Sequence, residues 1–196
     1  AEKNVFFVEY ELLPLQNPVT VHAYETEVIP RGEGQWPEMR STGKVNVLTI
    51  PYYSDWVGKR GVRFPFAYLI STPDPEITAK LRQHGLIVER LTEASTLEVE
   101  AFRIKELKSA EKAYQGHHLN AVKGEYAVEK KAFPAGALFV PTAQPLGALA
   151  ACLLEPESDD GLLVWNFFDR AVVPQWSREL QTYPGYKLMK PANLAR

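Results

Sequence analysis

Runs of β-branched and aromatic residues, broken by proline and glycine, dominate the first 62 residues of this 196-residue chain. Three such runs are NVFFVEYELL, PVTVHAYETEV and GKVNVLTIPYY, and the breaks between them include QNP and PRGEGQWPE. Residues of these types favour extended backbone, whereas proline and glycine mark its ends. The sequence therefore predicts three strands with long connections in this part of the chain.

The next segment has the pattern of a strand, a helix and a second strand. RFPFAYLIST is a short apolar run, PDPEITAKLRQHG carries helix start and stop signals, and LIVERLT is a second β-branched run. Asp74 is placed to cap the helix, Pro75 fits its first turn, and Gly85 can adopt the left-handed conformation that ends it. We therefore expect a βαβ unit with a parallel pair of strands.

The remaining sequence predicts further strands and one buried helix. LEVEAFRIKELK alternates as a half-buried strand does, and HLNAVKGEYAVEKKAF is expected to pair with it in antiparallel fashion, with a bend at Gly124. PAGALFVP is typical of a short strand. TAQPLGALAACLLEP is typical of a helix that is apolar nearly all round. GLLVWNFF is typical of a strand that completes the core. The tail YPGYKLMKPANLAR is expected to form a surface strand and a loose end.

Together these patterns predict an α+β fold, with a mixed β-sheet and two or three packed helices. Residues 1–62 are assigned to a β-rich N-terminal segment that need not fold independently, and residues 63–196 to an α+β domain. A chain of this length with 45% hydrophobic residues can bury a core of that size.

Composition excludes several classes of protein. The net charge is −2, from 22 basic and 24 acidic residues without a long run of either sign, so we expect no nucleic-acid partner. No apolar run approaches the roughly 20 residues that span a bilayer, so we expect no transmembrane segment. Cys152 is the only cysteine and lies in the apolar run GALAACLLE, which excludes an intrachain disulfide and a cysteine-rich zinc site and predicts a buried thiol.

One pair of residues has a spacing used by zinc hydrolases. His22 and Glu25 form an H-x-x-E motif, and His117 is a possible third ligand. The surrounding sequence has the period of a strand, which directs His22 and Glu25 to opposite faces. We therefore expect surface residues here, with no metal site and no catalytic residue. For His117 and His118 we expect a turn with one exposed and one half-packed imidazole.

Four carboxylates follow the predicted apolar helix: Glu155, Glu157, Asp159 and Asp160. Their alternation is similar to a calcium loop, but the position where a bidentate glutamate closes such a loop is Asn166. Pro156 and Gly161 bracket the acids and indicate a solvated turn. We expect the acids to be exposed and the following aromatics to be buried: Trp165, Phe167 and Phe168. A glycosidase that uses two of these carboxylates is the alternative.

Aromatic residues offer a further possibility, a face that stacks on peptides or sugars. The candidates are Trp36, Tyr52, Tyr53, Trp56, Trp165 and Trp176. Most of them are expected in the core. The sequence contains no G-x-S-x-G elbow, P-loop or G-x-G-x-x-G. It therefore lacks the motifs that usually indicate a serine hydrolase, an NTPase or a dinucleotide-binding enzyme.

The run FPAGALFVPTAQPLGALAACLLEPESDDGLLVWNFFDR, residues 133–170, resembles the C-terminal region of bacterial zinc carboxypeptidase-like proteins of the carboxypeptidase A type. LRQHGLIVERLT and YQGHHL look like the same region, so the resemblance covers most of residues 60–190. It implies a parent protein in which a metallopeptidase domain comes first and an extension like this one follows. The family places an H-x-x-E pair and a later histidine on zinc, with a distant glutamate as general base.

The resemblance assigns that chemistry to the parent's peptidase domain. Only 21 residues precede His22, too few for the framework that presents such a pair, so no zinc ligand is carried over to His22, Glu25 or His117. Zinc is expected only in the peptidase domain of the same parent chain, which this segment is expected to stabilise or orient without activity of its own.

The resemblance also implies an exported bacterial protein, periplasmic or extracellular. Two other functions stay open: a peptide- or glycan-binding module that uses exposed aromatics, and a self-sufficient hydrolase that uses the four carboxylates.

Overall fold

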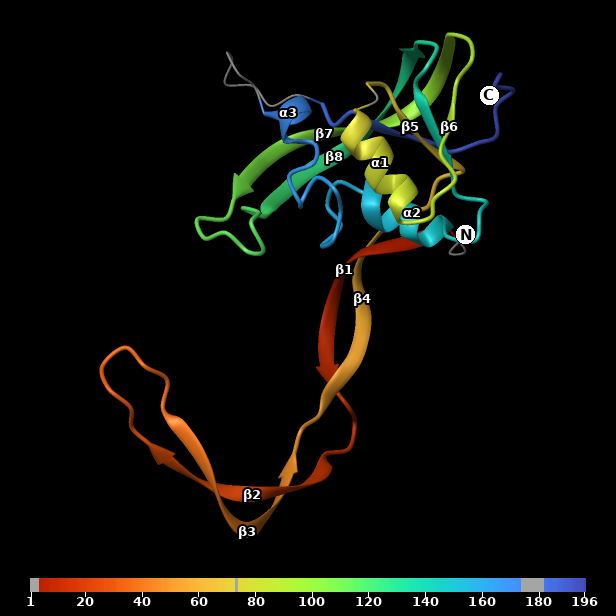
Figure 1. The fold of residues 1–196 in the computed structure, drawn as a ribbon. Coiled ribbons are helices and arrows are strands. Elements are labelled where there is room, and N and C mark those ends of the chain that lie inside the picture. The colour runs from red at the N-terminus through yellow and green to blue at the C-terminus, as the bar shows by residue number, and fades with distance from the viewer. Residues whose placement is uncertain (1–3, 73, 174–181) are drawn as a thin grey trace. The chain divides into compact units, whose positions relative to one another are not determined.

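The computed structural model describes residues 4–72, 74–173 and 182–196 (Figure 1). Their contacts divide the chain into two compact units. We call residues 1–9 and 58–196 the sheet unit and residues 10–57 the hairpin unit. The domain division predicted at residue 62 stays a prediction.

Ten strands and three short helices form in the described residues. The strands are β1 (Val5–Pro14), β2 (Val19–Ile29), β3 (Glu38–Ile50), β4 (Tyr53–Arg63), β5 (Ala67–Ile70), β6 (Glu89–Arg90), β7 (Ser95–Ser109), β8 (Asn120–Phe133), β9 (Leu138–Pro141) and β10 (Gly185–Leu188). The helices are α1 (Pro75–Gln83), α2 (Gly147–Leu154) and α3 (Asp169–Val172). The protein is therefore mostly β, and the predicted α+β class is wrong. None of these helices has the length and apolarity needed to cross a membrane.

The sheet unit contains a six-stranded sheet in the order β6-β9-β5-β10-β7-β8. Every neighbouring pair in it is antiparallel. The two strands of the predicted βαβ unit, β5 and β6, do not pair, because β9 lies between them. The predicted parallel pair is therefore wrong, since local sequence shows where strands lie but not which later strand enters between them.

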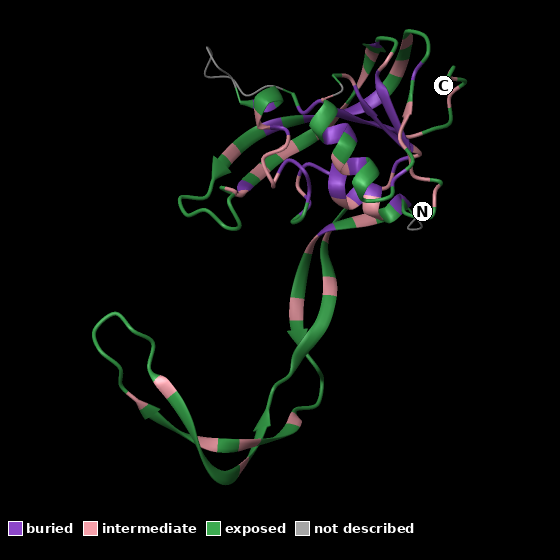
Figure 2. Cartoon of the chain, viewed as in Figure 1, coloured by how far each residue is buried: buried purple, intermediate pink, exposed green. Residues whose placement is uncertain are grey.

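Side chains from both faces of this sheet are buried. On the helix face, Tyr68 and Ile70 of β5 belong to a cluster with buried residues of α1 and α2. On the opposite face, Ala67 and Leu69 pack in a second cluster, against which the tail residues Ala192 and Leu194 lie. The loose end predicted for the tail is therefore wrong. Figure 2 shows the buried residues concentrated in the sheet unit, whereas the hairpin unit is almost entirely exposed.

Several elements follow their local signals. The backbone N–H of Glu76 donates to the Asp74 carboxylate at 2.7 Å, which caps α1, and Gly85 has a φ of +81° just after the helix ends. The β7–β8 pair is antiparallel, as predicted, and its register shifts beside Gly124. The helix predicted in the apolar run of residues 142–156 is confirmed as α2.

Two segments near the C-terminus differ from the prediction. The run GYKL forms β10, which is buried between β5 and β7 rather than lying at the surface. Residues 161–168 form consecutive turns instead of a strand. Their hydrogen bonds are local: the N–H of Trp165 donates to the Gly161 carbonyl and that of Phe167 to the Leu162 carbonyl. Hydrophobic composition does not distinguish such turns from a buried strand.

The N-terminal part is extended, as predicted, but with four strands rather than three. In the hairpin unit, β2 pairs antiparallel with β3, from Val19 opposite Ile50 to Ile29 opposite Glu38. The register shifts after Tyr24, and Gly43 in the bulged part of β3 has a φ of +76°. Strand β1 pairs with β4.

Candidate functional site

A buried ion pair joins the end of α2 to the middle of the sheet. Glu155 follows α2 and is 1% exposed, and Lys187 in β10 is 2% exposed. The Lys187 ammonium lies 2.8 Å from Glu155 Oε1 and also donates to the Arg63 carbonyl oxygen at 3.1 Å. Strand alternation explains the orientation of Lys187, because its neighbours Tyr186 and Leu188 pack on the opposite face of the sheet.

Two tyrosine hydroxyls complete the surroundings of the Glu155 carboxylate. Tyr68 donates to Oε1 at 2.5 Å and Tyr126 donates to Oε2 at 2.6 Å. The Lys187 ammonium lies 4.0 Å from the centre of the Tyr126 ring. We call Glu155, Lys187, Tyr68 and Tyr126 the buried carboxylate cluster. Both carboxylate oxygens are hydrogen-bonded, which is what the burial of a charge requires.

The electrostatics of the cluster keep the hydroxyls protonated. Burial, and then the charge of Glu155, raises the pKa of Tyr68, Tyr126 and the neighbouring Tyr183 well above the ordinary 10.0. Burial lowers the pKa of Lys187, and Glu155 opposes that effect. Because the two charged groups are almost completely buried, a substrate does not reach them. We interpret the cluster as a structural element that stabilises the packing of α2 against the sheet.

A surface hollow of about 610 Å³ is lined by residues of β1, β4, β8 and the turn after α2. The Arg60 guanidinium in it bonds to Glu157 and lies 3.5 Å from the Glu9 carboxylate. The second oxygen of Glu157 accepts the backbone N–H of Gly124 at 3.3 Å. At the same hollow, burial, followed by the charges of Glu9 and Asp160, raises the pKa of Asp159. Arg60 thus neutralises carboxylates that would otherwise repel one another, so the arrangement bridges β1, β4 and the turn after α2.

A second hollow of about 480 Å³ lies between α1, α2 and the turns of residues 160–167. Cys152 lines it and is half-buried, with its Sγ 3.8 Å from the Ser158 hydroxyl. Burial raises the pKa of Cys152, so its thiol stays protonated at neutral pH. The hollow therefore has the shape of a binding site without an activated nucleophile.

The structure places the candidate metal ligands in different surroundings. His22 is exposed on β2, and Glu25 on the same strand forms an ion pair with Lys44 at 2.9 Å. His117 is half-buried and packs against the rings of Trp165 and Phe167, whereas His118 is exposed, as predicted for this turn. In residues 4–72, 74–173 and 182–196, no group of three or more His, Cys, Asp or Glu side chains is arranged to hold a metal ion.

The predicted exposure of the four acids holds for only two of them. Asp159 and Asp160 are exposed, but Glu155 is buried and Glu157 is largely covered. Proline and glycine indicate where the chain turns, but not which side chains point inward. The predicted burial of the following aromatics holds for Phe168, whereas Trp165 and Phe167 are only half-buried.

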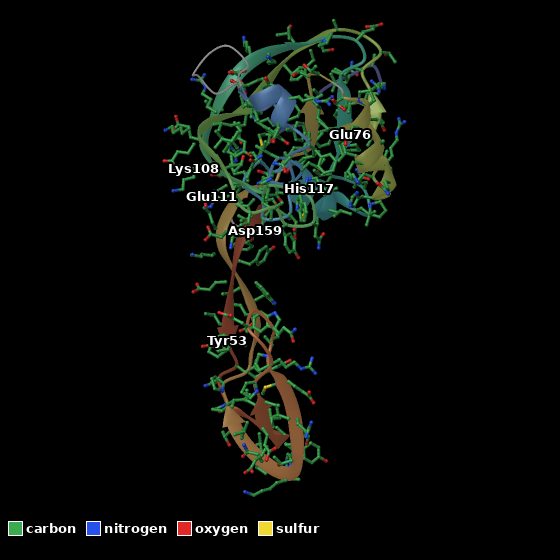
Figure 3. The ribbon with its side chains drawn as sticks, turned by 60° about the vertical axis from the view of Figure 1, so that its left-hand side comes forward. Tyr53, Glu76, Lys108, Glu111, His117 and Asp159 are labelled. Atoms are coloured by element: carbon green, nitrogen blue, oxygen red, sulfur yellow. The ribbon has the colours of Figure 1, made fainter. Side chains whose placement is uncertain are left out.

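The prediction that most of the other aromatic side chains are buried in the core is also wrong. Trp36, Tyr52, Tyr53 and Trp56 are exposed in the hairpin unit, where Figure 3 labels Tyr53. The strands of this unit belong to two separate two-stranded sheets, β1-β4 and β2-β3, and sheets of two strands have no interior in which to bury these side chains. Trp176 lies outside the described residues.

Sequence reasoning missed the partners of Glu155. Lys187 is the clearest signal among them, because it stands alone between Tyr186 and Leu188 in a short run with no other charge. A lysine in a buried strand requires a partner of opposite charge. The identity of that partner depends on how α2 packs on the sheet, which no local pattern reveals.

Comparison of the chain with protein-family models, with curated proteins and with solved structures finds no match.

Proposed function

We propose that this chain is a non-catalytic accessory domain of a zinc carboxypeptidase-like metallopeptidase, which it stabilises or orients through the hairpin unit. The resemblance of residues 133–170 supports the choice of parent protein. The observation that carries the proposal is the exposure of large apolar side chains along β2 and β3. On this account zinc belongs to the parent's peptidase domain, and the parent is exported to the periplasm or beyond the cell.

The cross-strand pairs of the hairpin are apolar but uncovered. Val28 lies opposite Met39, and the two are 58% and 59% exposed. Tyr24 and Val45 form a second exposed pair. A two-stranded hairpin is at best marginally stable in water, because it cannot bury its own apolar side chains. A covering partner would remove this apolar surface from water and stabilise the hairpin.

The type of surface favours a polypeptide partner. Val47 and Leu48 are adjacent and both exposed, so apolar side chains lie on both faces of the hairpin. Aliphatic residues are prominent, whereas a glycan-binding surface relies mainly on aromatic stacking. In the described residues β2 and β3 each pair on one side only, which leaves backbone groups at both edges for strand addition. The peptidase domain of the parent is the partner we assign to this surface.

The test measures binding between this chain and the parent's peptidase domain, expressed as separate polypeptides. Val28→Lys should weaken the complex at least about tenfold, because a charge would enter an apolar interface. Val128→Lys is the matched control, since Val128 is 64% exposed on β8 of the sheet unit. Equal affinity of the Val28 variant and the unaltered chain would overturn the docking role. Stoichiometric zinc binding and release of C-terminal amino acids by the isolated chain would overturn the non-catalytic role.

A peptide- or glycan-binding module is the second candidate, favoured by the exposure of Trp36, which is 90%. Trp56 is a further exposed indole of the hairpin unit. Stacking on such rings would make tryptophan fluorescence respond to peptidoglycan fragments or peptides in a saturable way. Trp36→Ala should then weaken the response. Absence of saturation with every ligand counts against this function.

A further inference from the structure

The hollow between α1, α2 and the turns of residues 160–167 has the properties of a small-molecule site. Its volume of about 480 Å³ falls within the range of roughly 300–1,000 Å³ found for ligand pockets. Lys80 reaches it from α1, Leu149 and Leu153 from α2, and His117 from the loop between β7 and β8. Because separate segments of the sheet unit meet here, the fold itself shapes the hollow. His117 is labelled in Figure 3.

Apolar side chains provide the lining for the body of a ligand. Leu153 and Leu162 are buried residues of the core that also line the hollow. The His117 ring lies 5.4 Å from the Trp165 ring and 6.0 Å from the Phe167 ring, measured between centroids. Such an aromatic wall beside aliphatic residues accepts a ring or a branched alkyl group.

A positively charged side chain lines the hollow. The Lys80 ammonium lies 5.1 Å from the centre of the Phe167 ring, and no carboxylate in the described part of the chain forms an ion pair with it. His84 lies one turn along α1, where its Nδ1 contacts the Lys80 carbonyl oxygen at 2.8 Å. An ammonium that has no acidic partner among the described residues and lies beside an apolar wall suits an anionic group attached to an apolar body.

An acidic side chain also lines the hollow. Asp160 accepts the indole N–H of Trp165 at 3.4 Å and is the carboxylate that lines the hollow. It would repel an anion, so the anionic group of a ligand belongs at the α1 end beside Lys80. Burial raises the pKa of Cys152, so its thiol adds no negative charge to the hollow at neutral pH.

We propose that this hollow binds small organic carboxylates with an aromatic or aliphatic body, with the carboxylate at Lys80 and the body between Leu149 and Trp165. The inference is independent of the proposed function of the hairpin unit. A free organic acid and the C-terminal residue of a peptide can both supply such a carboxylate attached to an aromatic or aliphatic body.

The test is a titration of the full chain with phenylacetate, followed by NMR of the leucine methyl groups. We expect saturable shifts at Leu149, Leu153 and Leu162. Phenylacetamide, which lacks the charge, should bind at least about tenfold more weakly. Lys80→Met should weaken phenylacetate binding to the same degree, and Lys80→Arg should retain it. Lys108→Met is the matched control, because Lys108 is exposed on β7 and does not line the hollow (Figure 3).

A tripeptide ending in phenylalanine distinguishes the two sources of ligand. If it shifts the same methyl groups and its C-terminal amide does not, the site takes C-terminal residues of peptides. If only phenylacetate binds, the site takes free acids. Unsaturated shifts, shifts confined to other surfaces, equal binding of the amide, or unchanged affinity of Lys80→Met with an unaltered melting curve would each overturn the proposal.

Discussion

At the scale of single residues, Glu155 and Lys187 depend on each other. Both side chains are buried, and the charge of each compensates the opposite charge of the other. Removal of one partner leaves an uncompensated charge among Tyr68, Tyr126 and the apolar residues of the helix face, which costs roughly 3–5 kcal/mol in comparable pairs.

Lys187→Met should therefore lower the free energy of unfolding by about 3–5 kcal/mol. In the double variant Glu155→Gln/Lys187→Met neither charge remains, so its loss should be smaller than the sum of the two single losses. Urea denaturation of the four proteins measures the coupling. Strictly additive losses would show that the pair does not act as a unit.

The three buried tyrosines predict a loss of stability at high pH. Their pKa is raised above 10.0 in the folded protein, so their contribution is complete below pH 10.0 and is lost as the pH rises through the folded pKa. The lowered pKa of Lys187 has the opposite effect on the pH dependence of stability, but it is one group and the tyrosines are three. We expect urea midpoints to fall above about pH 10 and to fall less steeply for Tyr126→Phe. A midpoint that stays constant there would contradict this assignment.

At the scale of elements, α2 begins where the backbone passes very close to another segment. A Cβ atom at Gly147 would overlap the carbonyl oxygen of Thr142. Gly147→Ala should displace α2 and cost about 3 kcal/mol, the upper end for overpacking. Gly32→Ala is the control, because a Cβ there meets no atom within 4 Å. Thermal denaturation compares the two, and equal melting temperatures would mean that α2 shifts at no cost.

Elements with local signals could be predicted from the sequence, whereas those defined by long-range packing could not. The cap at Asp74, the stop at Gly85 and the extended backbone of β7 are properties of neighbouring residues. The one-sided burial predicted for β7 is wrong, because Glu100 and Phe102 are buried as well as Val99 and Ala101. The central place of β10 depends on β5 and β7, which lie far earlier in the chain, so its sequence is equally compatible with a surface strand. For the same reason the acidic turn was predictable as a turn, but the burial of Glu155 was not.

At the scale of the whole molecule, the two units differ in how they are stabilised. The sheet unit has buried clusters on both faces of its sheet. The hairpin unit consists largely of the β2–β3 pair, with apolar side chains in contact with water. Local opening should therefore require less free energy in the hairpin unit than in the sheet unit.

Amide hydrogen exchange of residues 19–50 tests whether a peptidase domain covers β2 and β3. The rates are measured in the isolated chain and in its complex with the peptidase domain proposed as its partner. We expect exchange close to that of an open hairpin in the isolated chain, and exchange at least about tenfold slower in the complex if the peptidase domain covers β2 and β3. Equal rates in the isolated chain and in the complex, with β5 and β10 protected in both, would contradict it.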